Sequence, residues 1–205
     1  MVSASTARLV LEKNTGPASR LLDIAFKCGA FMRGDFILAS GRRSNHYFDG
    51  KKLMHSPEGI NAVGEAVFEE LEGVGIEAVG GLALGAYPIA TAVSLISFQK
   101  GKPIPSFIVR EEAKQHGTQK RIEGDLKPGA RVAIVDDVIT TGGSVVKAIE
   151  AVQDARCKVV KVVVLVDRHE GGADDLRKRG FNVTALLGLL PSGDVTIEEP
   201  TKAPR

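Results

Sequence analysis

The chain has 205 residues, a formal net charge of +2 and 43% hydrophobic residues, which are the proportions of an ordinary globular protein. The near-balanced charge excludes a nucleic-acid coat and an acidic tail, and the length suits a single domain, 1–205, with a real core. Cys28 and Cys157 lie far apart, which indicates buried thiols rather than a disulfide framework or a metal site. No secretory signal is evident, so we expect a cytoplasmic protein without nucleic-acid or membrane partners.

The first half begins with an apolar stripe that predicts a helix over residues 17–30. Aromatic and apolar residues between polar turns indicate short strands around a basic loop in 31–54. The next predicted helix covers 57–72, with Pro57 in its first turn and an apolar face turned to the core.

An uncharged run from Ala78 to Gln99 is 22 residues long, the length of a membrane span. It contains several glycines, Pro88 and three serine or threonine side chains, which fit a span poorly. A buried strand at 78–84, a glycine turn and a helix at 88–99 account for it better.

A short strand at 107–110 then leads into a polar segment, 111–128, which has no apolar period and is typical of a functional lid. Beyond it, continuously apolar strands alternate with helices, which predicts an α/β fold with a parallel sheet covered on both faces. The expected strands are 131–139, 159–167 and 181–189, the expected helices are 144–155 and 173–179, and the tail from Pro191 is expected to be irregular.

The sharpest motif is VAIVDDVITTGGSV, residues 132–145. A buried strand ends in two carboxylates, Asp136 and Asp137, and a turn of small residues opens a helix. Glycine backbone and a helix N-terminus form a phosphate cradle, and carboxylates beside it suit the hydroxyls of a ribose. An Asp that caps a helix explains one of the two acids, not both. The P-loop lysine and the GxGxxG pattern are both absent.

This motif resembles the phosphoribosyl-pyrophosphate (PRPP) motif of the type I phosphoribosyltransferases. The resemblance implies a mainly parallel sheet flanked by helices, with an N-terminal hood of short strands and helix at about 17–55, a core at 56–190 and a tail at 191–205. It implies that the acidic pair binds the ribose and that the loop binds the 5′-phosphate. The implied PRPP-binding residues in this motif are Asp136, Asp137, Val138, Ile139, Thr140, Thr141, Gly142, Gly143 and Ser144.

The segment VREEAKQHGTQKRIEG, residues 109–124, carries several cations around Gly117 and, taken alone, is equally typical of a solvated loop. Its R-x-x-x-K-x-H-G spacing resembles the catalytic loop of the orotate phosphoribosyltransferases, which reaches into the neighbouring subunit of a dimer. By this resemblance Arg110, Lys114 and His116 bind PRPP and stabilise the leaving pyrophosphate. Closure of such a loop would exclude water.

Three more segments are similar to that family in the same order. LASGRRSNHYFDGKKL (38–53) corresponds to the segment near the base, which places Tyr47 and Phe48 by orotate, although hydrophobic packing explains both rings equally well. VDRHEGG (166–172) matches the segment whose arginine binds the orotate carboxylate. GLALGAYPIA (81–90) resembles the pyrophosphate loop.

Arg168 is therefore the candidate for the orotate carboxylate, because its planar fork suits bidentate binding. An ordinary ion pair with Glu170 or Asp167 is the alternative. Thr140 is also expected to contact orotate.

Three positions depart from the family pattern. Glu111 stands where the family commonly has Lys, and Ala39 and Gly85 stand where several bacterial members have Lys. Fewer cations would then face the pyrophosphate. The candidates to compensate are Lys51, Lys52, Lys120 and Arg121.

The resemblance implies transfer of the phosphoribosyl group from PRPP to N1 of orotate, giving orotidine 5′-monophosphate and pyrophosphate in UMP biosynthesis. It implies a homodimer, and Mg²⁺ bound through PRPP and water rather than at a protein-built metal site. A transferase for another base is one alternative, which the segments 38–53 and 166–172 disfavour. A PRPP-binding regulator without turnover is another, which the retained loop cations disfavour.

Overall fold

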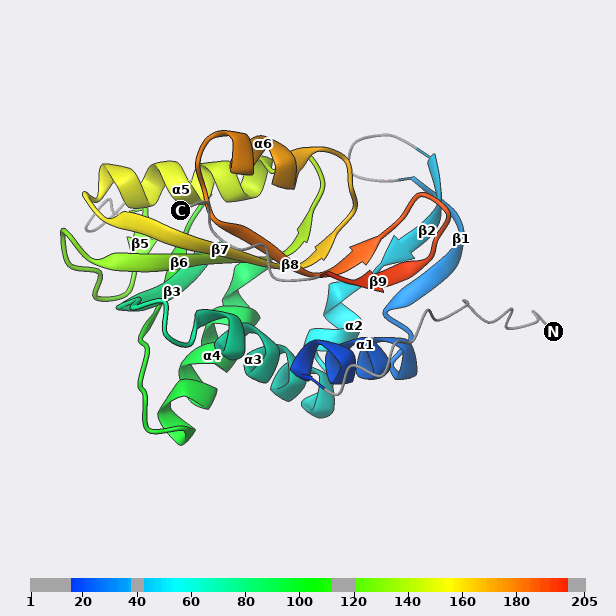
Figure 1. The fold of residues 1–205 in the computed structure, drawn as a ribbon, viewed down its shortest axis with the longest axis horizontal. Coiled ribbons are helices and arrows are strands. Elements are labelled where there is room, and N and C mark those ends of the chain that lie inside the picture. Colours follow the sequence, from blue (N-terminus) through cyan, green and yellow to red (C-terminus); the bar gives the residue numbers. More distant parts are fainter. Residues whose placement is uncertain (1–15, 38–42, 112–120, 199–205) are drawn as a thin grey trace.

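The computed structural model describes residues 16–37, 43–111 and 121–198. Its centre is a seven-stranded sheet in the order β5-β4-β3-β6-β7-β8-β9 (Figure 1). The five inner strands are parallel, and the two edge strands are antiparallel to their neighbours. The strands are β3 (Ala78–Leu82), β4 (Ser106–Val109), β5 (Ile122–Glu123), β6 (Arg131–Ile139), β7 (Lys158–Asp167), β8 (Val183–Leu189) and β9 (Val195–Ile197).

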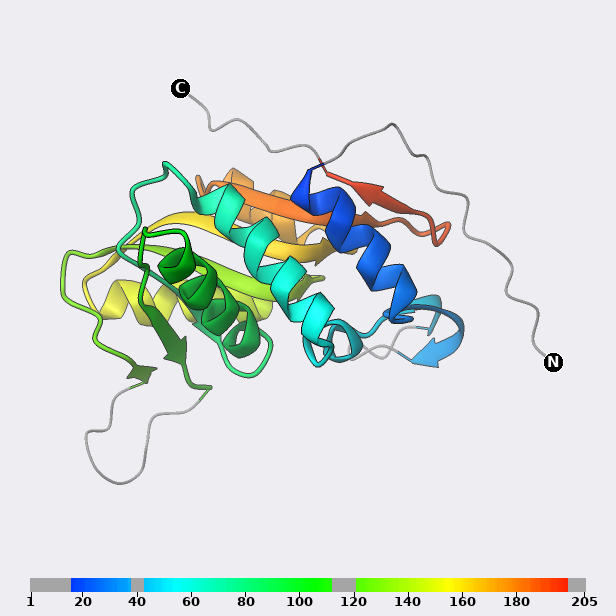
Figure 2. The ribbon, with the colours of Figure 1, turned by 90° about the horizontal axis from the view of Figure 1, so that it is seen from below.

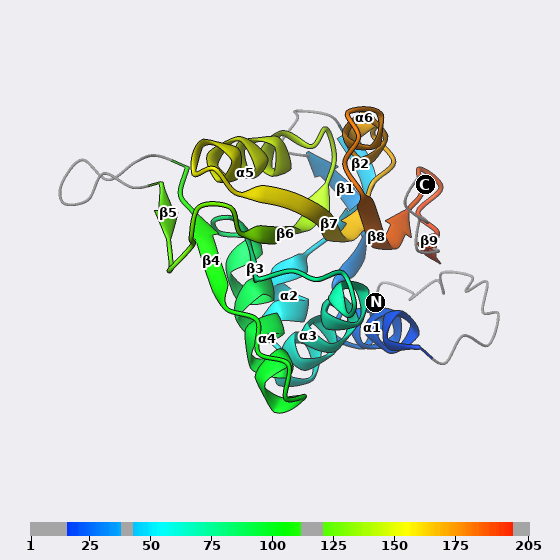
Figure 3. The same ribbon diagram turned by 60° about the vertical axis from the view of Figure 1, so that its left-hand side comes forward.

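Helices cover both faces of this sheet (Figures 1 and 3). One face carries α1 (Pro17–Lys27), α3 (Pro57–Leu71) and α4 (Ala86–Gln99), and the other carries α5 (Gly143–Asp154) and α6 (Gly172–Lys178). Two apolar clusters, one under each helical layer, take alternate residues of the inner strands. Burial on both sides explains why these strands are apolar throughout.

One charged side chain lies within this core. Lys161, on β7, donates to the hydroxyl of Thr184 at 2.7 Å and lies 3.4 Å from Glu70 of α3. The buried ammonium is therefore both hydrogen-bonded and paired, as burial of a charge requires.

The N-terminal hood consists of α1, a two-stranded antiparallel sheet and the short helix α2 (Gly50–Met54) (Figures 1 and 2). Its strands are β1 (Phe31–Ile37) and β2 (Arg43–Phe48). The aromatic rings of Phe31 and Phe48 pack 4.9 Å apart and anchor this sheet in the core. Ser44 of β2 contacts Arg168, which follows β7, so the hood lies over the carboxyl ends of the strands.

The carboxyl ends of β3 and β6 form the topological switch point of the sheet. The two strands are neighbours, but the connection after β3 leads through α4 to β4 on one side, and that after β6 leads through α5 to β7 on the other. A crevice opens where connections diverge in this way, and it is the usual ligand site of open α/β sheets.

The predicted mainly parallel sheet, flanked by helices, is confirmed. Two edge strands differ from expectation: β5 lies within 111–128, and β9 lies in the tail that was expected to be irregular. Both have only two or three residues, too few to show an apolar period, and each gains its hydrogen bonds from a longer neighbour. None of the helices in the described part of the chain could cross a bilayer.

Candidate functional site

The acidic pair lies at the carboxyl end of β6. Asp136 is 5% exposed, and its carboxylate accepts hydrogen bonds from the Ser144 hydroxyl at 2.6 Å and from the Asp137 backbone N–H at 3.1 Å. The Asp137 carboxylate accepts from the Val138 N–H at 2.9 Å. The strand and the start of α5 therefore fix both carboxylates before any ligand is present.

Burial dominates the electrostatics of these acids. It raises the pKa of Asp136 to about 7, with the neighbouring charge of Asp137 adding to the effect and the Ser144 hydrogen bond opposing it. Burial also raises the pKa of Asp137, against its backbone hydrogen bonds and the positive charge of Lys51. Near neutral pH the pair therefore holds less than its full negative charge, and a cation or ribose hydroxyls would favour the ionised form.

Two glycines allow other elements to approach the acidic pair closely. A Cβ on Gly85, at the start of α4, would lie 2.7 Å from one oxygen of each carboxylate. A Cβ on Gly50, at the start of α2, would lie 3.0 Å from the other oxygen of Asp137. The crevice is therefore bounded by the ends of β3 and β6 and by the hood.

The loop after β6 has the shape expected of a phosphate cradle. Gly142 has a φ of 82°, a left-handed conformation that favours glycine, and from there α5 begins with its N–H groups unpaired by the helix. Thr140 also accepts a hydrogen bond from the Gly172 N–H at 2.9 Å. A Cβ on Gly172 would lie 2.5 Å from the Thr140 carbonyl oxygen and 2.6 Å from the Gly142 nitrogen, so α6 packs directly behind this loop.

A cavity of about 570 Å³ opens between the hood and the ends of β7 and β8. It is lined by Arg43, Ser44, Asn45, His46, Arg168, His169, Glu170, Leu189, Leu190 and Pro191. The Arg168 backbone N–H donates to the Ile139 carbonyl at 3.1 Å, so this base-side cavity adjoins the phosphate-type loop.

Sequence reasoning placed Arg168 here and named Glu170 as its alternative ion-pair partner, a pair that the structure shows at 3.3 Å, but it missed the side chains of Ser44 and His46. Burial, then the positive charges of Arg33 and Arg168, lower the pKa of His46, against the opposing charge of Asp194. The left-handed Gly193 packs against the imidazole of His46, where a Cβ would overlap the ring. Period-two alternation along β2 gives the only sequence signal, because Ser44 and His46 share one face of that strand.

The aromatic residues expected beside the base lie elsewhere. Phe48 is buried in the core against Phe31, and Tyr47 stacks on Phe36 with ring centroids 5.3 Å apart. Neither ring is among the residues that line the cavity. Hydrophobic packing, the alternative interpretation of the two rings, accounts for their positions. A contact of either ring with orotate stays a prediction.

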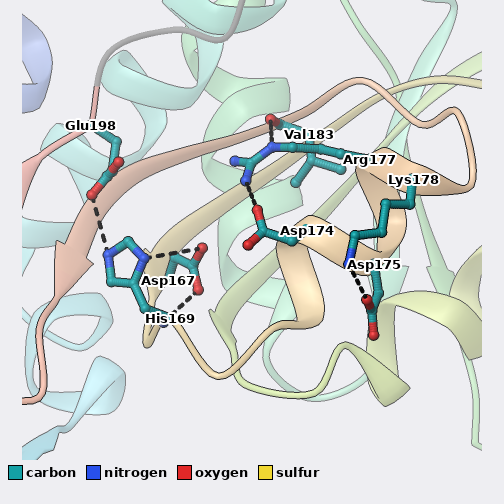
Figure 4. A network of polar contacts seen from close by, with 8 residues as sticks. All are labelled: Asp167, His169, Asp174, Asp175, Arg177, Lys178, Val183 and Glu198. Atoms are coloured by element: carbon teal, nitrogen blue, oxygen red, sulfur yellow. Dashed lines mark hydrogen bonds and ion pairs between the residues drawn. The ribbon is translucent and has the colours of Figure 1, made fainter.

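The loop between β7 and α6 is held by carboxylates. The Asp167 carboxylate accepts from the His169 backbone N–H at 2.8 Å, and the imidazole Nε2 lies 3.4 Å from Glu198 (Figure 4). On α6, Arg177 pairs with Asp174 at 2.9 Å (Figure 4). The His169–Glu198 contact joins the loop that carries Arg168 to the sheet edge just after β9.

Of the cations in this segment, Arg110 and Arg121 fall in the described part of the chain, whereas Lys114, His116 and Lys120 lie outside it. Arg110 pairs with Glu123 at 2.9 Å, and its N–H donates to the Arg121 carbonyl at 2.8 Å, which joins the two ends of the segment.

Besides Gly85 and Arg121, three of the positions that bear on the missing cations can be placed. Glu111 is exposed. Lys52 turns toward the Gly29 carbonyl at 3.4 Å, whereas the charge of Lys51 acts on Asp137. Ala39 lies outside the described residues.

No cluster of three or more His, Cys, Asp or Glu side chains that could hold a metal ion occurs in residues 16–37, 43–111 and 121–198. The two carboxylates of the acidic pair stand beside the phosphate-type loop. That donor set suits a divalent cation that arrives with a phosphorylated ligand and keeps most of its waters.

The phosphoribosyl transferase domain family matches residues 50–186. The orotate phosphoribosyltransferase of Sorangium cellulosum is 47% identical over 160 residues, which cover 77% of this chain and 83% of that protein. The crystal structure of Mycobacterium tuberculosis orotate phosphoribosyltransferase with Fe(III) dicitrate aligns with a TM-score of 0.75 and 35% identity, over 85% of this chain and 97% of that one. The same enzyme in complex with PRPP aligns with a TM-score of 0.65 and 29% identity, over 84% and 89% of the two chains.

Proposed function

The chain belongs to the orotate phosphoribosyltransferases, and on that premise we propose that the crevice at β3 and β6 and the cavity at Arg168 together form its active site. The reaction transfers the 5-phosphoribosyl group of PRPP to N1 of orotate, giving orotidine 5′-monophosphate and pyrophosphate. One observation carries the proposal. The Arg168–Ile139 hydrogen bond of 3.1 Å joins a cavity for an anionic base to a loop for a sugar phosphate.

PRPP occupies the crevice in this proposal. Asp136 and Asp137 accept hydrogen bonds from the two ribose hydroxyls, and the N–H groups and hydroxyls of residues 138–144 hold the 5′-phosphate at the start of α5. The pyrophosphate lies toward the turn after β3, where Gly85 leaves room beside the acidic pair. Lys51 is the described cation whose charge lowers the pKa of Asp137, which makes it the candidate to replace a missing lysine.

Orotate occupies the cavity beside the hood. The Arg168 guanidinium binds its carboxylate, and Thr140, whose carbonyl already accepts from Gly172, lies between the base and the phosphate. A cavity of about 570 Å³ accommodates a single pyrimidine ring with its substituents.

The chemistry needs no protein nucleophile. N1 of orotate forms a bond to C1′ as the bond from C1′ to the pyrophosphate oxygen breaks, with inversion. The electron pair leaves with pyrophosphate, and the proton of N1 passes to solvent. Positive charge develops on the ribose and negative charge on the leaving group. The chain contributes by positioning the two substrates and by stabilising these charges, with the acidic pair below the ribose.

A Mg²⁺ ion bound together with PRPP would neutralise charge on the pyrophosphate. The residues of this chain that face it in the proposal are Asp136 and Asp137, whose ionised forms a cation favours.

The segment between β4 and β5 supplies the remaining positive charge in this proposal. Arg110, Lys114 and His116 surround the leaving pyrophosphate, and the Arg110–Arg121 backbone contact acts as the fixed base of the loop. Closing the segment excludes water, the competing acceptor of the phosphoribosyl group.

We further propose a homodimer formed through α3 and α4. Tyr87, Leu95 and Phe98 of α4 are 56%, 57% and 73% exposed, and an apolar groove of about 340 Å³ runs between the two helices. Contiguous exposed apolar side chains of this kind mark interaction surfaces. The two free thiols suit the reducing cytoplasm, where UMP biosynthesis would use the product.

The direct test mixes the protein with PRPP, Mg²⁺ and orotate and follows the loss of orotate absorbance. We expect orotate to disappear and pyrophosphate to accumulate in equal amounts. Uracil and adenine in place of orotate serve as controls. Turnover of one of these bases without turnover of orotate would replace the proposal with another phosphoribosyltransferase, and binding of PRPP without any turnover would favour a regulator.

A further inference from the structure

Arg168 is held by two partners from different parts of the chain. Its Nε lies 3.3 Å from the Glu170 carboxylate, and its Nη2 donates to the Ser44 hydroxyl at 3.3 Å. The Arg168 and Glu170 side chains are only 11% and 9% exposed. Ser44 is itself fixed, since its hydroxyl donates to the His46 carbonyl at 2.7 Å and accepts from the His46 N–H at 3.2 Å.

We propose that Glu170 is a positioning residue for orotate: it holds the Arg168 guanidinium so that one defined edge of the fork faces the base-side cavity. The inference rests on the proposed function, because it assumes that Arg168 receives the orotate carboxylate. It adds that the selectivity of Arg168 for a base with a carboxylate depends on Glu170.

The geometry of the guanidinium supports this role. Glu170 lies on the Nε side of the guanidinium and Ser44 accepts from Nη2, so the two partners hold it from that side. The edge that remains carries parallel N–H groups, the arrangement that a carboxylate binds bidentately. Without Glu170, a buried and flexible side chain of this length would sample several rotamers and rarely present that edge.

The charges around the cavity support it as well. Glu170 balances the charge of Arg168, burial lowers the pKa of His46, and Arg43, the other arginine of the lining, lies 3.7 Å from Asp35. Selection of an anionic base then depends more on the fixed direction of the fork than on a general attraction for anions. The buried Nε–H also makes no hydrogen bond in the described structure, despite the nearby carboxylate, which is unfavourable unless a ligand realigns the pair.

The test compares Glu170→Ala and Glu170→Gln in steady-state kinetics. In Glu170→Ala we expect KM for orotate to rise about 10-fold or more, with kcat and KM for PRPP changed less than about 3-fold, because only uniform binding of the base is lost. Glu170→Gln keeps the shape and an acceptor oxygen, so it should recover most of the lost affinity. Glu198→Gln is the matched control, since Glu198 contacts His169 on the same loop but not Arg168.

A second measurement separates positioning from damage to the fold. Uracil lacks the carboxylate, so its inhibition constant should be the same in wild type and Glu170→Ala. Equal losses for uracil and orotate would overturn the proposal, as would an unchanged KM for orotate in Glu170→Ala. If Glu170→Ala fails to fold, Glu170→Leu decides, since leucine fills a similar volume without an acceptor oxygen: an unchanged ratio of orotate to uracil affinity in Glu170→Leu would overturn the proposal.

Arg168→Ala distinguishes failure of this inference from failure of the proposed function. If Arg168→Ala raises KM for orotate but Glu170→Ala does not, the positioning role alone is wrong. If Arg168→Ala leaves orotate binding unchanged, the proposed base site is wrong.

Discussion

At the scale of single residues, the acidic pair depends on the absence of a side chain at Gly85. Its φ of −56° is open to any residue, so only space excludes one. In Gly85→Ala the new Cβ would lie 2.7 Å from an oxygen of each carboxylate and push both away from the crevice. Because displacement of about 1 Å at a reacting centre costs on the order of 10²-fold, we expect kcat/KM to fall by about that factor while the melting temperature changes little. Wild-type kinetics in this variant would contradict the placement of PRPP.

The raised pKa of Asp136 predicts how the ligand-free protein responds to pH. The native carboxyl, with a pKa of about 7 against an ordinary 3.8, keeps a proton that the unfolded chain releases. The free energy of unfolding therefore falls as the pH rises from about 4 to about 7. Asp136→Asn removes this penalty. At pH 8 the variant should be more stable than wild type by up to about 4 kcal/mol, and the gain should vanish near pH 4.

Urea denaturation at the two pH values measures this difference, and activity assays should show the accompanying loss of about 10²–10³ in kcat. An equal stability difference at pH 4 and pH 8 would show that the carboxyl is not protonated in the native state.

At the scale of elements, the phosphate-type loop is supported from behind by the start of α6. Gly172→Ala would place a Cβ within 2.6 Å of the loop backbone and tilt its N–H groups away from the 5′-phosphate. We expect KM for PRPP to rise about 10-fold or more, since misplacement of this size weakens such contacts, with a smaller effect on orotate. Gly171→Ala, at a position with nothing within 4 Å but a φ of 96°, is the control for backbone strain alone. Equal effects of the two substitutions would argue against the packing explanation.

The segment between β4 and β5 carries its own prediction. If Lys114 faces the leaving group, Lys114→Ala should lower kcat by about 10²–10³, as loss of one charge-stabilising group does, and leave the melting temperature unchanged. Lys147→Ala, an exposed change on α5, is the control for a simple loss of surface charge. A variant with nearly wild-type kcat would contradict the clamp.

At the scale of the whole molecule, the exposed face of α4 predicts the assembly. Leu95→Asp puts a charge into the apolar groove between α3 and α4 and should convert a dimer into monomers, as measured by light scattering during gel filtration. If the loop also acts across the interface, the monomer should lose activity that mixing with a loop-defective variant partly restores. Glu150→Lys on α5 is the control, and an unchanged mass in Leu95→Asp would place the interface elsewhere.

Much of the architecture follows from local pattern. The continuous apolar runs of β6 and β7 mark them as inner parallel strands, and the acids after Val135 identify the end that faces the ligand. Residues that act through contacts with distant parts of the chain cannot be identified from local sequence pattern. Ser44 reaches Arg168 across 124 positions, and Gly85 meets the acidic pair only because β3 and β6 are neighbours in the sheet. For Phe48, the neighbouring sequence suggests a contact with the base, whereas the structure buries its ring beneath the hood.

The loops after β6 and β7 share two backbone hydrogen bonds, from Arg168 to Ile139 and from Gly172 to Thr140. A shift of either loop on binding its substrate would therefore be transmitted to the other loop. The two affinities are then thermodynamically linked: the factor by which bound PRPP changes the affinity for orotate equals the factor by which bound orotate changes the affinity for PRPP. The product contains the base and the ribose phosphate in one molecule, so it contacts both loops at once. Its release requires the contacts with both loops to break together.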